Sequence, residues 1–463
     1  MNPEPMKRSK RENVIETLAR LLLIISMSIS LSCNFDFGGT PIDGDDDDDT
    51  SCTAEVVERV SVASNGAQAN GNSDSPSISS DGSLIAFISE ASNLVLNDSN
   101  AADDVFVHDR NAGTTERVSV DSNGTEADDD SFTLSLSSDG DFVAFGSFAT
   151  NLVVGDTNDF SDIFVYDLIT DITERVSVAS NGTEANGDSS HVDISSAGRF
   201  VSFVSEATNL VANDTNGKSD IFVHDLINGE TERVSIASDG TQADADSSFT
   251  SISSDGRYVA FSSAATNLVA DDTNGLADFF VHDRQDATTE LVIGPSVFDI
   301  GGGIVNVAPM ISPDGIFVGF RSPDDTLVPG DTNNSVDTFL INRDTDIIER
   351  LSLSSSEIQG NADSGNPSIS TDNQFVVFPS NATNLVSNDT NGVEDVFVRN
   401  RDTGNTRRVS LTFDCVEGDL GSFMAVISAD GEFVAIASLA ENLVDNDSNG
   451  FADVFVIPNP LIP

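Results

Sequence analysis

The fold of this chain is decided by the stretch Val192-Asp193-Ile194-Ser195-Ser196-Ala197-Gly198-Arg199-Phe200-Val201-Ser202-Phe203 and by its counterparts elsewhere in the sequence. Apolar and small polar residues flank a short turn, which is typical of two strands joined by a tight hairpin. Asp-Gly between apolar runs is a strong hairpin signal, and five counterparts have it at this turn. They are Asp81-Gly82, Asp139-Gly140, Asp255-Gly256, Asp314-Gly315 and Asp430-Gly431.

The same unit continues with two more expected strands. A polar loop over residues 206–219 leads to Ile221-Phe222-Val223-His224-Asp225, whose apolar residues point to both faces of a sheet. A second tight turn, Ile227-Asn228-Gly229, precedes Glu232-Arg233-Val234-Ser235-Ile236. This last run alternates, so one of its faces is expected to meet solvent. Each unit is therefore predicted to form four strands.

The unit occurs seven times. The string Phe-Val-x-Asp, or a close relative, begins at successive intervals of 58, 58, 58, 59, 58 and 58 residues. Its starts are Phe106, Phe164, Phe222, Phe280, Phe339, Phe397 and Phe455. Four-stranded units repeated four to eight times are the signature of a β-propeller. A solenoid of stacked sheets is the alternative, but it needs capping units, and no distinct cap is visible in the sequence.

The repeats are displaced by one strand, which predicts how the ring closes. The fourth-strand string appears at Glu58-Arg59-Val60, before any first strand, and the last copy ends after its third strand. The sequence therefore predicts an all-β, seven-bladed propeller with four antiparallel strands per blade over residues 55–457. Residues 56–62 should pair beside residues 453–457 and leave no open edge. Residues 458–463 are expected to be a C-terminal tail.

Residues 1–32 have the pattern of an export signal. A basic start precedes the apolar run Leu21–Leu31, which is too short to cross a hydrocarbon core about 30 Å thick. The run ends at Ser30-Leu31-Ser32-Cys33, which resembles a bacterial lipobox and implies lipidation of Cys33. The departure is Ser30, where the lipobox pattern prefers leucine. Plain cleavage and an uncleaved anchor are the alternatives. Residues 33–54, with five consecutive aspartates, are expected to form an extended acidic tether.

The charge of the chain restricts its partners. Twenty-one Lys and Arg face 77 Asp and Glu, for a formal net charge of -56. Phosphates would repel such a chain, which argues against nucleic acid and against direct contact with anionic lipid, so membrane contact is expected through a lipid anchor only. Basic partners or divalent cations suit this charge. At 38% hydrophobic residues, the chain has too many apolar side chains for a disordered acidic protein.

The repeat resembles that of TolB-like propellers. The resemblance rests on Ser312-Pro313-Asp314-Gly315, its degenerate copies, and strands such as Asp395-Val396-Phe397-Val398. It covers about residues 55–457 and implies the propeller fold, but not a function, because propellers have many roles. TolB has an additional N-terminal domain for which this chain is expected to have no room. A role in the Tol system is therefore not implied.

The loop between the second and third strands carries the pattern Asp-Thr/Ser-Asn-x-x-x-Asp in all seven copies. Carboxylate and amide oxygens at such spacing are typical of loops for hard cations, so the pattern predicts structural Ca²⁺. Three side chains cannot supply six to eight oxygens, so carbonyls, waters or a neighbouring loop would have to contribute. Pure turn chemistry, with Asp bonded to the backbone, is the open alternative. The candidate ligands are Asp98, Asn100, Asp104, Asp156, Asn158, Asp162, Asp214, Asn216, Asp220, Asp272, Asn274, Asp278, Asp331, Asn333, Asp337, Asp389, Asn391, Asp395, Asp447, Asn449 and Asp453.

Other features of the sequence carry weaker expectations. His108, His224 and His282 share one third-strand position in different blades, which favours packing over a shared metal. Cys52 and Cys415 are expected at opposite faces of the ring, about 20 Å apart for a six-residue strand, and therefore not cross-linked.

No motif of a known catalytic type is present, so the chain is predicted not to be an enzyme. The leading hypothesis is a monomeric, lipid-anchored binding or scaffold module of the cell envelope, facing the periplasm or the cell surface. The loops between the second and third strands and between successive blades are expected on one face of the ring, the long-loop face, and the tight turns on the other, the tight-turn face. The partner would be an envelope protein or glycan, bound at the long-loop face near residues 294–307 and 412–423, whose sequences depart from the repeat. One alternative is a hydrolase or lyase that acts on polysaccharide through acidic residues of the central channel. A structural surface-layer component and a secreted protein are the others.

Overall fold

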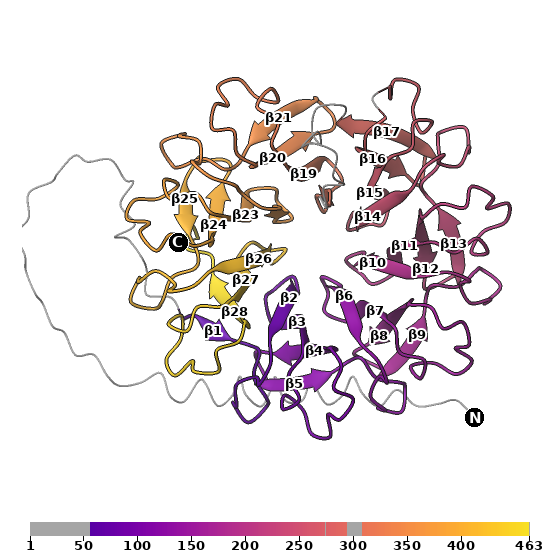
Figure 1. The fold of residues 1–463 in the computed structure, drawn as a ribbon, viewed down its shortest axis with the longest axis horizontal. Coiled ribbons are helices and arrows are strands. Elements are labelled where there is room, and N and C mark those ends of the chain that lie inside the picture. The colour runs from indigo at the N-terminus through magenta and orange to yellow at the C-terminus, as the bar shows by residue number, and fades with distance from the viewer. Residues whose placement is uncertain (1–55, 274, 294–307, 463) are drawn as a thin grey trace, which may run out of the picture. The chain divides into compact units, whose positions relative to one another are not determined.

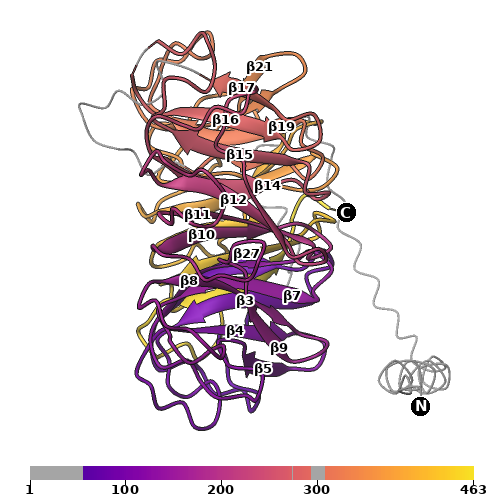
Figure 2. The ribbon, with the colours of Figure 1, turned by 90° about the vertical axis from the view of Figure 1, so that its right-hand side faces the viewer.

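The computed structural model describes residues 56–273, 275–293 and 308–462, and every regular element in these ranges is a strand. Seven sheets of four antiparallel strands surround one axis, each sheet forming a blade (Figure 1). Figure 2 shows the same ring edge-on. The prediction of an all-β, seven-bladed propeller is confirmed. The described residues contain no helix that is long and apolar enough to span a membrane.

We number the blades along the chain and give the strands from the axis outward. Blades 1 to 3 contain β2 (Ser73–Ile78), β3 (Leu84–Ser89), β4 (Asp104–Asp109) and β5 (Thr114–Arg117); β6 (Ser131–Leu136), β7 (Phe142–Ser147), β8 (Asp162–Asp167) and β9 (Ile172–Arg175); and β10 (Ser189–Ile194), β11 (Phe200–Ser205), β12 (Asp220–Asp225) and β13 (Glu230–Arg233). Blades 4 and 5 contain β14 (Ser247–Ile252), β15 (Tyr258–Ser263), β16 (Asp278–Asp283) and β17 (Thr288–Ile293); and β18 (Met310–Ile311), β19 (Phe317–Ser322), β20 (Asp337–Asn342) and β21 (Ile347–Arg350). Blades 6 and 7 contain β22 (Ser368–Ile369), β23 (Phe375–Ser380), β24 (Asp395–Asn400) and β25 (Thr406–Arg408); and β26 (Ser422–Ile427), β27 (Phe433–Ser438), β28 (Asp453–Pro458) and β1 (Glu58–Arg59).

The ring is closed by the N-terminal strand. β1 is the outermost strand of blade 7 and pairs antiparallel with β28, Glu58 opposite Val456. The predicted closure is therefore confirmed, and it removes the open sheet edge. After β28, Asn459 is buried and donates to the carbonyl of Gly431 over 2.8 Å, and Leu461 packs on the core of blade 7. The expected C-terminal tail thus packs on the ring as far as residue 462.

Phenylalanine fills the space within and between the blades. Phe203 on β11 and Phe222 on β12 are fully buried, and their ring centroids lie 5.9 Å apart. The ring of Phe200, at the start of β11, sits on the Asp-Gly turn of the next blade. A Cβ atom at Gly256 would lie 2.1 Å from Phe200 Cδ2, and Gly256 has φ +72°. The Asp-Gly turn therefore needs glycine both for its backbone and for the contact between blades.

In the six connections between blades that the structure describes, a short hairpin follows the outermost strand and folds back toward the tight-turn face. In blade 3, Ile236 bridges Gln242, and Ser238 at the tip accepts a hydrogen bond from the Thr289 amide of the next blade over 2.9 Å. The tip therefore lies beside the start of the next outermost strand. Five hairpins make this serine-to-amide contact, at Ser64, Ser122, Ser180, Ser238 and Ser355.

This hairpin geometry corrects the expectation for the cysteines. Cys415 lies on the corresponding hairpin of blade 6 and is disulfide-bonded. The expectation that Cys52 and Cys415 are not cross-linked stays a prediction, because Cys52 lies outside the described residues, but the expected placement of Cys415 is wrong, because its hairpin does not remain at the long-loop face. Phe413 and Val416 instead line one pocket with Val56 and Val57, at the start of the closing strand. Its partner is Cys33 or Cys52, the chain's other cysteines, and both lie outside the described residues.

Candidate functional site

The aspartate loops form a polar clamp around an arginine. In blade 3, Arg233 Nη1 lies 3.0 Å from Asp214 Oδ1 and 3.0 Å from Asp220 Oδ2. Asn216 donates to Asp220 over 2.9 Å, and the Ser235 hydroxyl donates to its other oxygen over 2.6 Å. Asp220 is the first residue of β12 and is fully buried, so the loop motif, the third strand and the outermost strand meet at one point.

The clamp recurs in six blades, and blade 4 departs from it. Its arginines are Arg59, Arg117, Arg175, Arg233, Arg350 and Arg408, each paired with both aspartates of its loop. In blade 4, Leu291 and Ile293 stand where the other blades have this arginine and the serine, while Asp272 and Asp278 remain. Asn274, the middle residue of that loop, lies outside the described residues.

Arginine supplies the charge compensation for which calcium was predicted. Burial raises the pKa of Asp162, while the hydrogen bond from Ser177 and the charge of Arg175 lower it. Burial and the charge of Asp162 raise the pKa of Asp156. Across the described ranges, His, Cys, Asp and Glu side chains form no group of three or more that could hold a metal ion. Calcium at these loops stays a prediction.

The innermost strands carry bulges with unusual backbones. The register of β10 on β11 shifts between Ser190 and Asp193, and His191 between them has φ +47°. His191 Nδ1 lies 3.0 Å from Ser190 Oγ, and its ring meets the Phe249 ring edge-on at 4.7 Å. Burial lowers the pKa of His191. The left-handed residues at these bulges are Ser75, Thr133, His191, Phe249 and Met424.

Asp193 is the acidic residue that the innermost strands place at the contact between blades. Its carboxylate accepts hydrogen bonds from the Ser135 hydroxyl at 2.9 Å and from the Ile252 amide at 2.8 Å. Burial raises its pKa, against these hydrogen bonds. Because Ser135 belongs to blade 2 and Ile252 to blade 4, the carboxylate ties three blades together.

The three third-strand histidines are packing residues in separate blades. Each is buried, and its Nδ1 lies 2.8 Å from a threonine hydroxyl of the outermost strand, as for His224 and Thr231. Thr231 donates to the carbonyl of Val178, so His224 Nδ1 must be the donor in its contact with Thr231. Arg399, which can only donate, makes the same contact with Thr406 in blade 6.

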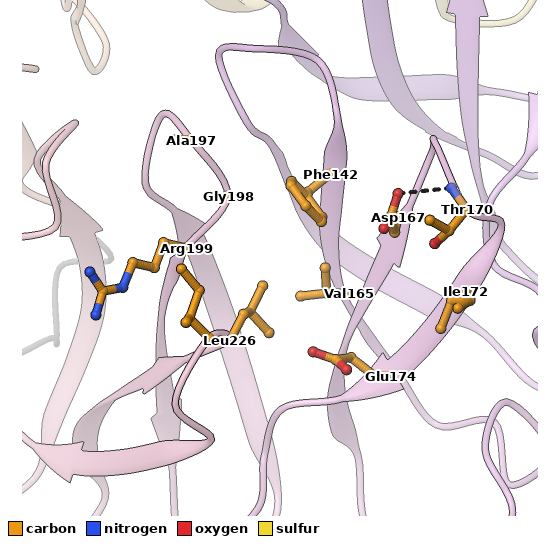
Figure 3. Close-up of a pocket in the computed structure, with 11 residues that line it drawn as sticks. Phe142, Val165, Asp167, Thr170, Ile172, Glu174, Ala197, Gly198, Arg199 and Leu226 are labelled. Atoms are coloured by element: carbon orange, nitrogen blue, oxygen red, sulfur yellow. Dashed lines mark hydrogen bonds between the residues drawn. The ribbon is translucent and has the colours of Figure 1, made fainter. Parts of the chain in front are cut away.

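A pocket of about 410 Å³ opens on the tight-turn face between blades 2 and 3 (Figure 3). Phe142, Glu174, Gly198 and Leu226 line it, together with Asp167. Burial, followed by the charge of Asp167, raises the pKa of Glu174. This pocket was not predicted from the sequence. The signal was a break in the repeat, because Leu226 replaces an arginine that four other blades have at this position.

The rim of this pocket exposes large apolar side chains. Ile227 is 73% exposed, Ile172 50% and Ile169 47%. Ile172 and Ile227 line the pocket, and Ile169 belongs to the turn that joins β8 to β9. Exposed isoleucines that line a pocket beside carboxylates, as Ile172 and Ile227 do, mark a surface suited to bind another molecule.

Almost all positive side chains of the described residues form ion pairs within the chain. Each pairs with an Asp or Glu of the chain within 4.0 Å, as Arg401 does with Glu349 at 2.9 Å. These residues are Arg59, Arg110, Arg117, Arg175, Arg199, Lys218, Arg233, Arg257, Arg284, Arg343, Arg350, Arg399, Arg401 and Arg408. Most carboxylates of the described residues are not buried, so few positive side chains are left to balance their charge at the surface.

Solved structures with a similar fold are found for this chain. No protein-family model matches the chain, and no curated protein sequence matches it. The β-propeller domain of the Trilobed protease from Pyrococcus furiosus has a TM-score of 0.53 at 12% identity, over 84% of this chain and 95% of that one. An oligogalacturonate lyase in complex with manganese has a TM-score of 0.52 at 12% identity, over 89% and 95%.

TolB from Acinetobacter baumannii is among the similar structures, with a TM-score of 0.37 at 13% identity. The match covers 65% of this chain and spans 60% of the TolB chain. At such identities the structural likeness is one of fold, a β-propeller. The Pyrococcus furiosus domain has an open Velcro topology, whereas β1 closes the ring here by pairing with β28.

Proposed function

We propose that this chain is an exported binding and scaffold module of the cell envelope, anchored through a lipid on Cys33, whose partner is a basic protein. The observation that carries the proposal is the internal use of positive side chains, which leaves a surface dominated by carboxylates. Such a surface attracts basic partners over long distances and repels nucleic acid. The exposed isoleucines beside the pocket of blades 2 and 3 supply apolar area for a stable contact.

The anchor and the binding are tested separately. The full chain is expressed in bacteria, and fractionation should find it in the membrane, with Cys33→Ala released into the soluble fraction. If the variant remains membrane-bound, the anchor is an uncleaved helix and not a lipid. The immobilised mature chain should capture basic proteins from envelope extract in a salt-sensitive way. Capture of neutral or acidic proteins alone would contradict the proposed partner class.

A second candidate is a polysaccharide lyase or hydrolase acting in the central channel. His191 favours it, because a titratable side chain with a lowered pKa stands at a left-handed bulge of an innermost strand. An oligogalacturonate lyase shares the fold. The test is an ultraviolet assay for unsaturated products from oligogalacturonate and from other uronate oligomers. Activity that disappears in His191→Ala would support this candidate, and no turnover by the wild type would remove it.

A further inference from the structure

Four junctions between neighbouring blades contain the same arginine contact on the tight-turn face, which is distinct from the polar clamp of the aspartate loops. Arg284 stacks over the Phe200 ring at 4.2 Å, and its Nε donates to Glu232 over 2.6 Å. Its Nη1 donates to the carbonyl of Gly256. One guanidinium therefore meets an aromatic ring, a carboxylate and a backbone carbonyl. The other three arginine contacts are those of Arg110 with Phe433, Glu58 and Gly82; Arg343 with Tyr258, Glu290 and Gly315; and Arg401 with Phe317, Glu349 and Asn373.

The junction between blades 2 and 3 keeps the three partners but not the arginine. Phe142, Glu174 and Gly198 stand at the positions of the ring, the carboxylate and the carbonyl, and all three line the pocket. Leu226 stands where the arginine would be. Its amide donates to the carbonyl of Arg199 in the same blade over 2.9 Å, as the Arg284 amide donates to the carbonyl of Arg257, so the backbone is placed alike. The leucine side chain cannot reach the three partners as a guanidinium does, and the space forms the pocket (Figure 3).

The charges around the pocket favour a cation. Arg199, at its edge, pairs with Asp225 at 2.7 Å and stacks over Phe200 at 4.5 Å. Figure 3 shows its guanidinium on the far side of Leu226, turned away from the pocket. Burial raises the pKa of Glu174, so a bound cation would relieve the cost of its charge.

We propose that this pocket receives an arginine side chain of a basic partner protein, which stacks on Phe142 and pairs with Glu174. The inference rests on the proposed function and specifies its contact. The chain itself builds this guanidinium site four times, which identifies the ligand chemistry. The exposed Ile172 and Ile227, which line the pocket, identify its source, because a polypeptide around the arginine would cover these side chains and a free guanidinium compound would not. A buried arginine within an apolar rim is a common anchor of protein interfaces.

The first test uses defined peptides. The probe is a short acetylated peptide with one central arginine flanked by leucines, and two matched peptides have citrulline or lysine in its place. Titration of the intact chain at physiological salt should shift the methyl signals of Ile172 and Ile227 with the arginine peptide. Citrulline keeps the shape but loses the charge, so we expect it to bind at least about tenfold more weakly. Equal binding of the arginine and citrulline peptides would overturn the proposal.

The second test uses variants that fill the pocket or remove its carboxylate. Leu226→Arg supplies an internal guanidinium, and Glu174→Gln removes the carboxylate, so each should weaken binding of the arginine peptide about tenfold or more. Glu232→Gln is the matched control, since Arg284 already occupies that junction, and its affinity should equal that of the wild type. A melting temperature of Leu226→Arg at or above that of the wild type shows that the variant is folded.

The outcomes separate the two proposals. Unchanged peptide affinity in the folded Leu226→Arg and Glu174→Gln variants would overturn the pocket as the arginine site. If these variants still captured basic envelope proteins, the proposed function would stand and the pocket inference would fail. If the wild type captured no basic protein and bound no arginine peptide, both would fail.

Discussion

Ser61 Oγ lies 2.5 Å from Asp453 Oδ1, although 392 residues separate the two in the chain. The other oxygen of this carboxylate lies 3.4 Å from Arg59 Nη1. The clamp matches that of blade 3, where Ser235 donates to Asp220 over 2.6 Å within 15 residues. The closing strand is therefore held by the same polar contacts as an outermost strand that is continuous with its blade.

Replacing the carboxylate of the closing clamp should loosen the ring. Asp453→Ala leaves Arg59 buried beside one remaining aspartate, and we expect a loss of about 3–5 kcal/mol in the free energy of unfolding. The matched control is Asp220→Ala, which removes the same clamp inside blade 3. Both should lower the urea midpoint, but only Asp453→Ala should speed amide exchange of Val60, which bonds to the Val454 carbonyl. Equal exchange in both variants would contradict a special role of the closing strand.

Alanine substitutions at two glycines should distinguish the cost of a left-handed backbone from the cost of a steric clash between blades. Gly240 has φ +85° and open space around it, so Gly240→Ala should cost about 1–2 kcal/mol for the left-handed backbone alone. Gly256→Ala has the same backbone cost and also meets Phe200, which should add about 1–3 kcal/mol. Urea unfolding measures both. A smaller loss in Gly256→Ala than in Gly240→Ala would show that Phe200 moves away freely.

The buried histidines should make stability fall as the pH is lowered. Burial lowers the pKa of His108, His224 and His282. Near pH 6.5 the unfolded chain takes up protons that the folded histidines do not, so stability is full above this pH and falls below it. Each histidine contributes at most about 1.4 kcal/mol per pH unit. We expect the His224→Asn variant to have a shallower decrease between pH 7 and 5 than the wild type, by chemical denaturation. An identical decrease in both would exclude His224 as a source.

The arginine of a clamp can be removed to test for calcium. Arg233→Met leaves Asp214 and Asp220 without their counter-charge and should cost about 3–5 kcal/mol. If the loop oxygens bind a cation, CaCl₂ should then raise the melting temperature of the variant more than NaCl of equal ionic strength. Equal rises with both salts would contradict the calcium prediction for this loop. The wild type, measured alongside, reports the effect of calcium on an occupied clamp.

The disulfide partner of Cys415 can be identified directly. Val56 lines a pocket with Phe413 and Val416, and Cys52 lies four residues before Val56 in the chain. We therefore expect mass spectrometry of unreduced digests to find a peptide that joins Cys52 to Cys415. A peptide that joins Cys33 to Cys415 would instead exclude lipidation of Cys33 in the same molecule.

The sequence by itself determined the seven blades, the four strands of each and the closing strand. These features depend on hydrophobic periodicity, on Asp-Gly turns such as Asp255-Gly256 and on the spacing of the repeats, all of which are local or countable in the chain. The position of Glu58-Arg59-Val60 before any first strand determined the closure, because an unpaired strand must complete the last sheet.

Only the tertiary structure decided what the polar residues contact. The aspartates of the loops were found by their spacing, but their arginine, such as Arg233 for Asp214, lies on another strand. The hairpin of Cys415 folds back toward the next blade, which strand lengths do not reveal. The pocket arises because Leu226 replaces one arginine between Phe142 and Glu174, which lie 84 and 52 residues earlier in the chain. The physical reason is that these contacts join different strands or neighbouring blades, so they depend on how the sheets pack around the ring.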